Sequence, residues 1–102
     1  MSNSRVRVTL PAHLKTLAGV TGEVHLDVEG MVSAASIIDT LERNFPALRG
    51  TIRNPATNQR RPFIRFFVAG GDLSHQPLGQ PLPDDVAAGV EPFFIIGAMA
   101  GG

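Results

Sequence analysis

The chain offers few side chains that could act as nucleophiles or metal ligands. It has no cysteine, which excludes thiolate nucleophiles, disulfides and cysteine-ligated metal centres. Its three histidines, His13, His25 and His75, are far apart and lack the spacing of a metal site. Gly70-Gly71 lacks the surrounding residues and the following helix of a phosphate-binding loop. We therefore expect no metal, no bound cofactor and no turnover by the chain alone.

The remaining candidate for chemistry is the C-terminal segment Ala98-Met99-Ala100-Gly101-Gly102, which directly follows a predicted strand. Glycine has no Cβ, so a Gly-Gly end can pass a narrow channel and adopt the backbone angles that an active site demands. Six extended residues from Gly97 reach roughly 20 Å. The chemical group at this end is the carboxylate of Gly102. The alternative is that the two glycines form an inert end.

The composition is that of an ordinary globular protein. The chain has 102 residues, of which 43% are hydrophobic and 18% charged, and this length suits one domain with a single core. No apolar run is long enough to cross a membrane, and the N-terminal residues lack the apolar stretch of a secretory signal. These features predict a cytoplasmic protein.

Two segments alternate polar and apolar residues, as half-buried strands do. They are Arg5–Leu10 and Glu23–Val28, and in the second Val24, Leu26 and Val28 share one face. Residues 11–22 between them, interrupted by Pro11, Gly19 and Gly22, are expected to form a connection. The two strands should therefore pair as a hairpin with a long loop.

One helix is predicted after this hairpin. Ser33 is a good N-cap, because its hydroxyl can accept a hydrogen bond from a free amide of the first turn. Pro46 ends the helix, because proline lacks the amide proton that the helix needs. Between them apolar residues recur every three or four positions, at Ala34, Ile37, Ile38, Leu41 and Phe45.

The second half of the chain contains two further strand patterns. Residues 46–62, with three prolines, are expected to form a long loop before the central strand Phe63–Val68 and the Gly70-Gly71 turn. Residues 72–91 should be mostly turns, with a very short strand near Leu73, before a last strand over Pro92–Ile96. The order predicts an α+β domain over residues 1–96, with a mixed sheet of four or five strands on one main helix and a flexible tail over 97–102.

This order of elements, together with three short motifs, resembles a known family. The motifs are the Gly70-Gly71-Asp72 turn after the central strand, the turn Pro81-Leu82-Pro83-Asp84, and the terminal Ala100-Gly101-Gly102. They resemble the MoaD/ThiS-like bacterial sulfur carriers, which are related to the molybdopterin synthase small subunit and the thiazole-forming sulfur carrier. The resemblance implies a ubiquitin-like β-grasp fold. It also implies a partner, a ubiquitin-activating-type adenylyltransferase that uses ATP to adenylate Gly102.

In this family sulfur then displaces AMP and leaves a thiocarboxylate, which donates its sulfur to an acceptor synthase. The long segment containing Ile52-Arg53-Asn54-Pro55 looks like the carrier that serves a cysteine-forming synthase. A molybdopterin synthase small subunit is also compatible, and so are carriers for other sulfur metabolites. Two departures are Gly97, where relatives often have proline, and Ala69 before Gly70-Gly71, where they often have Asn or Asp. Two other classes stay open, a ubiquitin-like modifier joined to proteins through Gly102 and a binding module with an inert tail.

The predicted strands also leave large apolar side chains outside the core. If Ile64, Phe66 and Val68 are buried, Phe63, Arg65 and Phe67 point the other way. In the last strand Phe93 and Ile95 would be buried, which leaves Phe94 and Ile96 outside. An apolar patch on an uncovered sheet face suggests a contact with a partner, and we assign it to Phe67, Phe94 and Ile96. The alternative is that loop 46–62 folds over these side chains.

Charge is unevenly distributed although the net charge is zero. Six arginines and no acid occur from Arg43 to Arg65, whereas all charged side chains after Phe66 are acidic. Such asymmetry suggests directional docking to charged partners. Arg49, Arg53, Arg60 and Arg61 could instead bind phosphate or nucleic acid, but no aromatic residue is interleaved with them. We expect protein partners, with no nucleic acid and no membrane, and a monomer when the chain is free.

Overall fold

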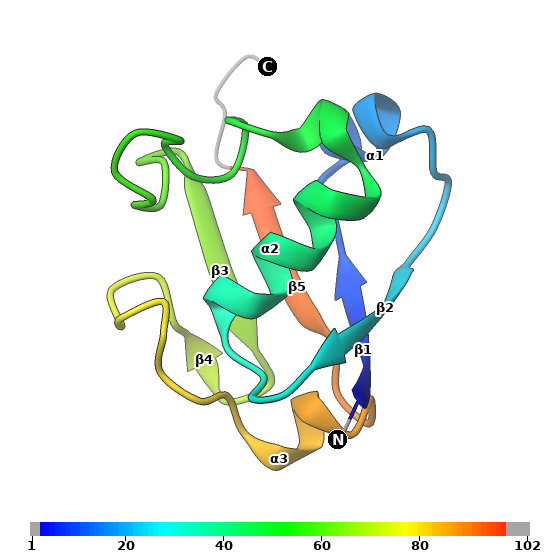
Figure 1. The fold of residues 1–102 in the computed structure, drawn as a ribbon, viewed down its shortest axis with the longest axis vertical. Helices are drawn as coiled ribbons and strands as arrows, with labels where there is room; N and C mark the ends of the chain where they lie inside the picture. The colour runs from blue at the N-terminus through cyan, green and yellow to red at the C-terminus, as the bar shows by residue number, and fades with distance from the viewer. Residues whose placement is uncertain (1–2, 98–102) are drawn as a thin grey trace.

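The structure is a computed structural model and describes residues 3–97 of the chain. Five strands, three α-helices and one 3-10 helix form one body (Figure 1). Within these residues no helix is long and apolar enough to cross a membrane. In chain order the elements are β1 (Asn3–Thr9), α1 (Ala12–Ala18), β2 (Val24–Glu29), α2 (Ala34–Asn44), η1 (Pro46–Leu48), β3 (Ile64–Val68), β4 (Gly71–Asp72), α3 (Asp84–Ala87) and β5 (Phe93–Gly97).

The five strands form one mixed sheet in the order β2-β1-β5-β3-β4. The central pair β1 and β5 is parallel, and the other neighbours are antiparallel. Helix α2 crosses one face of this sheet, and α1 and α3 lie at its two opposite ends (Figure 1). The predicted α+β arrangement, a mixed sheet packed on one main helix, is confirmed.

The hairpin predicted from the alternating segments is present. β1 and β2 pair in antiparallel register, with Val6 opposite Leu26 and Val8 opposite Val24. Val24, Leu26 and Val28 are all buried, while the residues between them are exposed. The pattern of period two therefore identifies both the strand and the face that it buries.

Helix α2 begins and ends where the sequence predicts. The hydroxyl of Ser33 accepts a hydrogen bond from the amide of Ser36 at 3.1 Å, and the hydroxyl of Ser36 accepts one from the amide of Ser33 at 2.8 Å. This reciprocal pair is a capping box. The helix ends at Asn44, and Phe45 is followed by Pro46. Four of the five predicted stripe residues are buried, and the fifth, Phe45, is half-buried against the core.

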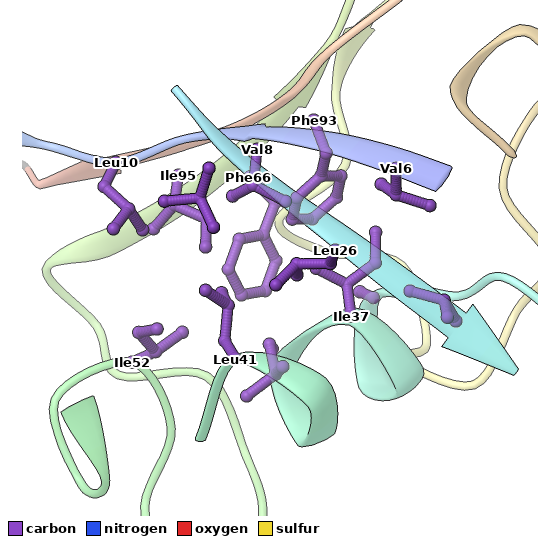
Figure 2. Close-up of a cluster of buried hydrophobic side chains, with 14 of the residues drawn as sticks. Val6, Val8, Leu10, Leu26, Ile37, Leu41, Ile52, Phe66, Phe93 and Ile95 are labelled. Carbon is purple, nitrogen blue, oxygen red and sulfur yellow. The ribbon is translucent and has the colours of Figure 1, made fainter. Parts of the chain in front are cut away.

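The core lies between the sheet and α2 (Figure 2). The rings of Phe66 and Phe93 meet at its centre, with centroids 5.4 Å apart and planes inclined by 37°. Such tilted aromatic pairs add roughly 0.5–1.5 kcal/mol beyond the burial of their area. Fully buried side chains from β1, β2, α2 and β5 surround this pair, including Val6, Val8, Leu26, Ile37, Leu41 and Ile95.

Two helices were not predicted. Residues 11–22, expected to be a plain connection, contain α1, and the turns predicted over 72–91 include α3. Pro11 precedes α1 and Gly19 ends it in the left-handed region at φ 73°, so two residues interpreted as loop signals are helix boundaries. Leu14, the buried residue of α1, anchors this helix to the core. The very short strand expected near Leu73 is present as β4.

Loop 46–62 packs on the helix side of the molecule rather than over the outer face of the sheet. It starts with η1, and its side chains Leu48 and Ile52 are fully buried in the core. Arg53 is held against α2, where its Nη2 lies 3.0 Å from Oε1 of Glu42 and also contacts Asp39. The loop thus acts as part of the core packing, which its irregular sequence does not indicate.

The residues that follow β4, among them the buried Ser74, hydrogen-bond to backbone groups of β3 that β4 is too short to reach. The hydroxyl of Ser74 accepts a hydrogen bond of 2.9 Å from the amide of Phe66, and the amide of Leu73 donates to the carbonyl of Phe66 at 2.7 Å. Ser74 is 5% exposed. Its hydroxyl therefore satisfies a buried backbone donor in the middle of β3.

Replacement of Ser74 by alanine should lower the free energy of unfolding by about 1–3 kcal/mol, because the amide of Phe66 loses its acceptor inside the protein. The measurement is urea denaturation followed by circular dichroism. Thr21→Ala, in the exposed turn before β2, is the control and should change stability by less than about 0.5 kcal/mol. Equal stability of Ser74→Ala and Thr21→Ala would contradict this role.

Candidate functional site

The strand that leads to the C-terminal segment is the central strand of the sheet. β5 is hydrogen-bonded to β1 on one side and to β3 on the other. Its inward side chains Phe93 and Ile95 have no exposed surface. The strand runs one residue further than the sequence pattern predicts, to Gly97, which is opposite Ile64 in β3. The predicted working residues Ala98, Met99, Ala100, Gly101 and Gly102 lie outside the described residues, so they stay predictions.

Gly97 lies directly against helix α1. A Cβ built on Gly97 would be 2.5 Å from Cε1 of the His13 ring, a separation that real Cβ atoms do not show. The absence of a side chain at this position therefore allows the imidazole to lie beside the end of β5. This contact joins residues that are far apart in the sequence, and sequence reasoning missed it because α1 was not predicted. The available signal was Ala12–Ala18, a segment of good helix formers between proline and glycine.

The outer face of the sheet carries the apolar residues that were assigned to partner binding. Phe67 of β3 is directly opposite Phe94 of β5, and Phe94 is opposite Thr9 of β1. Ile96, opposite Arg65, is 40% exposed, whereas Phe67 and Phe94 are half-buried. The structure thus brings all three side chains together on neighbouring strands, on the face that α2 does not cover.

Two groups of charged residues lie on either side of this apolar strip. On the β4 side Nη1 of Arg65 lies 3.1 Å from Oδ2 of Asp72. On the β1–β2 side Nε of Arg7 lies 2.9 Å from Oε1 of Glu23, and His25 Nε2 lies 3.1 Å from the same oxygen. Exposed ion pairs contribute little to stability. They do surround the strip with charges of both signs, as on a polar interface rim.

Hydrogen bonds within these groups favour the ionised carboxylates. The bonds from Arg7 first, and from His25 second, lower the pKa of Glu23 below its usual range. The bonds from Ser74, followed by the ion pair with Arg65, lower the pKa of Asp72. Correspondingly, the hydrogen bond to Glu23 raises the pKa of Arg7. Both carboxylates therefore stay charged at neutral pH beside the apolar strip.

Most arginines of the basic segment are used inside the protein. Partial burial lowers the pKa of Arg53, but the bonds to Glu42 and Asp39 outweigh this effect, so its pKa is raised. Arg60 donates to the backbone carbonyls of Ser74, Arg61 and Ile64, and Arg61 donates to that of Gly50. Three of the four arginines considered for phosphate or nucleic acid are thus engaged by protein groups, and this weakens that alternative.

The cavities do not resemble an enclosed active site. One, of about 570 Å³, is an open depression at the β4 edge, lined by residues 58–60 and 74–78. Among residues 3–97 no group of three or more His, Asp or Glu side chains is placed to hold a metal ion. A second depression of about 290 Å³ lies between α1, Gly50, Thr51 and Phe63, at the same end of the molecule as Gly97.

No protein-family model matches the sequence, and no curated protein is similar enough to count as a relative. Solved structures, in contrast, match nearly the whole chain. The crystal structure of SAMP1 from Haloferax volcanii matches with a TM-score of 0.73 and 22% identity, covering 96% of this chain and 99% of that chain. The structure of the Methanosarcina acetivorans small archaeal modifier protein 1 matches over 100% of both chains, with a TM-score of 0.73 and 21% identity.

Two CysO structures show the same likeness. A chain of the Amycolatopsis orientalis BexX/CysO complex matches with a TM-score of 0.72 and 23% identity, covering 95% of this chain and 99% of that chain. Mycobacterium tuberculosis CysO matches with a TM-score of 0.70 and 21% identity, covering 92% and 99%. At these identities the likeness shows the fold. The predicted ubiquitin-like β-grasp fold, and the resemblance of the layout to that of CysO, are confirmed.

The lowered pKa values predict how stability depends on pH. A carboxylate whose pKa is lower in the folded state stabilises the protein above its unfolded pKa, and this stabilisation is lost as the pH falls through the folded pKa. The free energy of unfolding should therefore fall between about pH 5 and pH 3. Asp72→Asn should be less stable than the parent at pH 7, and the difference should shrink as the pH falls below about 4 toward the lowered pKa of Asp72.

The measurement is urea denaturation at a series of pH values. Glu29→Gln is the control, because Glu29 takes part in none of the ion pairs found within residues 3–97. It should leave the slope with pH unchanged. Parallel pH profiles for Asp72→Asn and the parent would show that Asp72 makes no such contribution.

Proposed function

We propose that the chain is a sulfur carrier in which the carboxylate of Gly102 is adenylated and then converted to a thiocarboxylate. The observation that carries this proposal is β5, a strand bonded on both edges, from which the sequence continues as Ala98-Met99-Ala100-Gly101-Gly102. The β-grasp fold, shared with CysO and SAMP1 structures over nearly their whole length, supports it.

The proposed chemistry needs only the C-terminal carboxylate from this chain. An oxygen of Gly102 attacks the α-phosphorus of ATP, and pyrophosphate leaves with the electrons of the broken P–O bond. Hydrogen sulfide ion (HS−) from a sulfide donor then attacks the acyl carbon, AMP leaves with the electrons of the broken C–O bond, and loss of the sulfur-bound proton to water leaves the thiocarboxylate. Adenylate is a far better leaving group than hydroxide, so one difficult substitution becomes two easier ones. ATP is held by the activating enzyme, and this chain acts as its cosubstrate.

The protein around the tail supplies position rather than catalysis. β5 holds Gly97 at one end of the sheet, and its side chains Phe93 and Ile95 are packed in the core with no exposed surface. Gly101 and Gly102 have no side chains that would obstruct entry to two different active sites. We accordingly propose that the isolated chain catalyses no turnover.

The proposed thiocarboxylate needs an acceptor enzyme for its sulfur. Likeness to two CysO structures favours delivery to a cysteine-forming synthase, as the segment Ile52-Arg53-Asn54-Pro55 suggested. The alternative acceptor is molybdopterin synthase, with the chain as its small subunit.

A second function has its own support, because the SAMP1 structures are those of modifier proteins. In that case the activated Gly102 would form an isopeptide bond with a lysine of another protein.

Incubation with a ubiquitin-activating-type adenylyltransferase, ATP and a sulfide donor should replace one oxygen of Gly102 by sulfur. Intact mass spectrometry detects this replacement, and fragmentation assigns it to the last residue. A variant that lacks Gly102 is the matched control and should stay unmodified. Isopeptide adducts without any sulfur product would favour the modifier function, and an unchanged mass with every activating enzyme tested would refute both.

We further propose that the activating enzyme contacts the outer face of the sheet at Phe67, Phe94 and Ile96. These side chains are adjacent across β3 and β5, and loop 46–62 is anchored on the other side of the sheet by Leu48, Ile52 and Arg53. Aromatic side chains at the centre of a contact contribute most to binding when polar groups around them exclude water.

Combined Phe67→Ala and Phe94→Ala substitution should weaken binding to the adenylyltransferase by about tenfold or more, because the contact loses its aromatic centre. Isothermal titration calorimetry measures the affinity, and thermal unfolding verifies that the variant is folded. Met31→Ala is the control, since Met31 is 56% exposed and precedes α2. Unchanged affinity of the folded double variant would exclude this face as the contact.

A further inference from the structure

The end of the molecule at which β5 reaches Gly97 is built from several distant segments. α1, η1, the C-terminal end of α2 and the residues before β3 all lie there (Figure 1). The His13 ring occupies the position that a Cβ of Gly97 would need. Helix α1 is thus the structural neighbour of the point from which the C-terminal segment starts.

The depression between α1 and Phe63 lies beside Gly97 and forms an apolar groove. It has a volume of about 290 Å³ and is lined by His13, Leu14 and Leu17 of α1, by Gly50 and Thr51, and by Phe63. Leu17 is 49% exposed and Phe63 is 39% exposed. With Ile96 of β5, these are three of the five large hydrophobic residues found exposed within residues 3–97. Exposed apolar surface is thus concentrated at this end, as at a contact site.

The two ends of the sheet differ in charge. Lys15 of α1, Arg43 of α2 and Arg49 after η1 belong to the groove end, and the ion pairs found within residues 3–97 include none of these three side chains. Acidic Asp84 and Asp85 start α3 at the opposite end of the sheet (Figure 1). The uneven charge of the sequence therefore becomes a basic groove end and an acidic far end.

We infer that this groove receives an apolar side chain of the adenylyltransferase that activates Gly102, with acidic residues of that enzyme facing Lys15, Arg43 and Arg49. The inference rests on the proposed function. Five residues separate Gly97 from the carboxylate of Gly102, a reach of at most about 18 Å. An enzyme that holds this carboxylate in its active site must cover the surface around Gly97. The groove falls within that covered area, whereas Phe67 and Phe94 lie further along the outer sheet face.

Other occupants fit the groove less well. A second copy of the chain in a two-fold arrangement would bring Lys15, Arg43 and Arg49 toward the same three residues of its partner, and like charges in contact oppose association. The chain's own segment 98–102 contains one large apolar side chain, Met99. The peptide groups of such a glycine-rich segment would find few hydrogen-bonding partners in an apolar groove. An enzyme surface with an apolar side chain surrounded by acidic residues matches both the apolar lining of the groove and the basic side chains around it.

Photo-crosslinking tests the occupant directly. The chain has no cysteine, so Leu17→Cys can be labelled at one site with a benzophenone maleimide. With the adenylyltransferase that charges the parent chain, and ATP, irradiation should link position 17 to the enzyme. Val90→Cys is the matched control, because Val90 is 61% exposed and lies outside the groove end. It should give at least about tenfold less product, since contacts reach little beyond the interface.

A kinetic measurement complements the crosslink. In ATP–pyrophosphate exchange, Leu17→Asn should raise the KM for the carrier about tenfold with little change in kcat, because it removes a docking contact remote from the reacting atoms. Arg49→Glu should raise the KM at low salt, and the effect should shrink at high salt. Val90→Asn should behave like the parent. Thermal unfolding verifies that each variant is folded.

The outcomes separate this inference from the proposed function. If no activating enzyme charges the parent chain, the proposed function fails and the groove inference fails with it. If the parent is charged while Leu17→Asn keeps the parental KM, the groove inference alone is overturned. Crosslinks from position 17 to a second copy, or to residues 98–102, overturn it as well.

Discussion

The packing of β5 between β1 and β3 is the constraint on which the rest of the structure depends. Phe93 and Ile95 are completely buried on one face of this strand, which pairs with β3 over Phe94–Gly97 and with β1 at Phe93 and Phe94. The ring of Phe93 meets that of Phe66 under helix α2. Moving β5 would therefore disrupt the sheet and the core together. As a result, Gly97, the last residue that the structure describes, ends a strand at the centre of the sheet.

From this fixed point the fold separates three surfaces. The inner face of the sheet is covered by α2 and by the anchored loop, with Leu48 and Ile52 completing the core. The outer face presents Phe67 and Phe94 between charged groups. The end of the sheet presents the groove beside Gly97. Under the proposed function the chain would visit two enzymes in turn, which requires surfaces that can be bound while the C-terminal residues enter an active site. The outer face and the groove end both meet that requirement.

The regular spacing of apolar residues predicted those strands and helices that bury one face along their length. β1, β2, β3, β5 and α2 were predicted because each buries side chains at regular intervals, and their buried faces were identified correctly. Helix α1 has one buried residue, Leu14, and α3 has one, Val86, too few for a period to be visible. The contact of His13 with Gly97 and the pairing of Arg53 with α2 join separate segments. Such contacts join residues that meet only in the folded chain, so no local sequence pattern predicts them. The role of Gly102 lies beyond the described residues and stays a prediction.

The choice of basic residues has a chemical consequence for an activated C-terminus. An acyl-adenylate reacts with thiolates and with unprotonated amines. The chain has no cysteine and no tyrosine, and Lys15 is its one lysine among nine basic residues. The other eight are arginines, whose guanidinium groups stay protonated and therefore do not attack an acyl carbon. Under the proposed function, the basic groove end would supply positive charge for docking while carrying few groups that could consume the activated carboxylate. Such a composition would protect a C-terminus that is made electrophilic, and the one lysine side chain, Lys15, belongs to the surface that the proposed enzyme contact would cover.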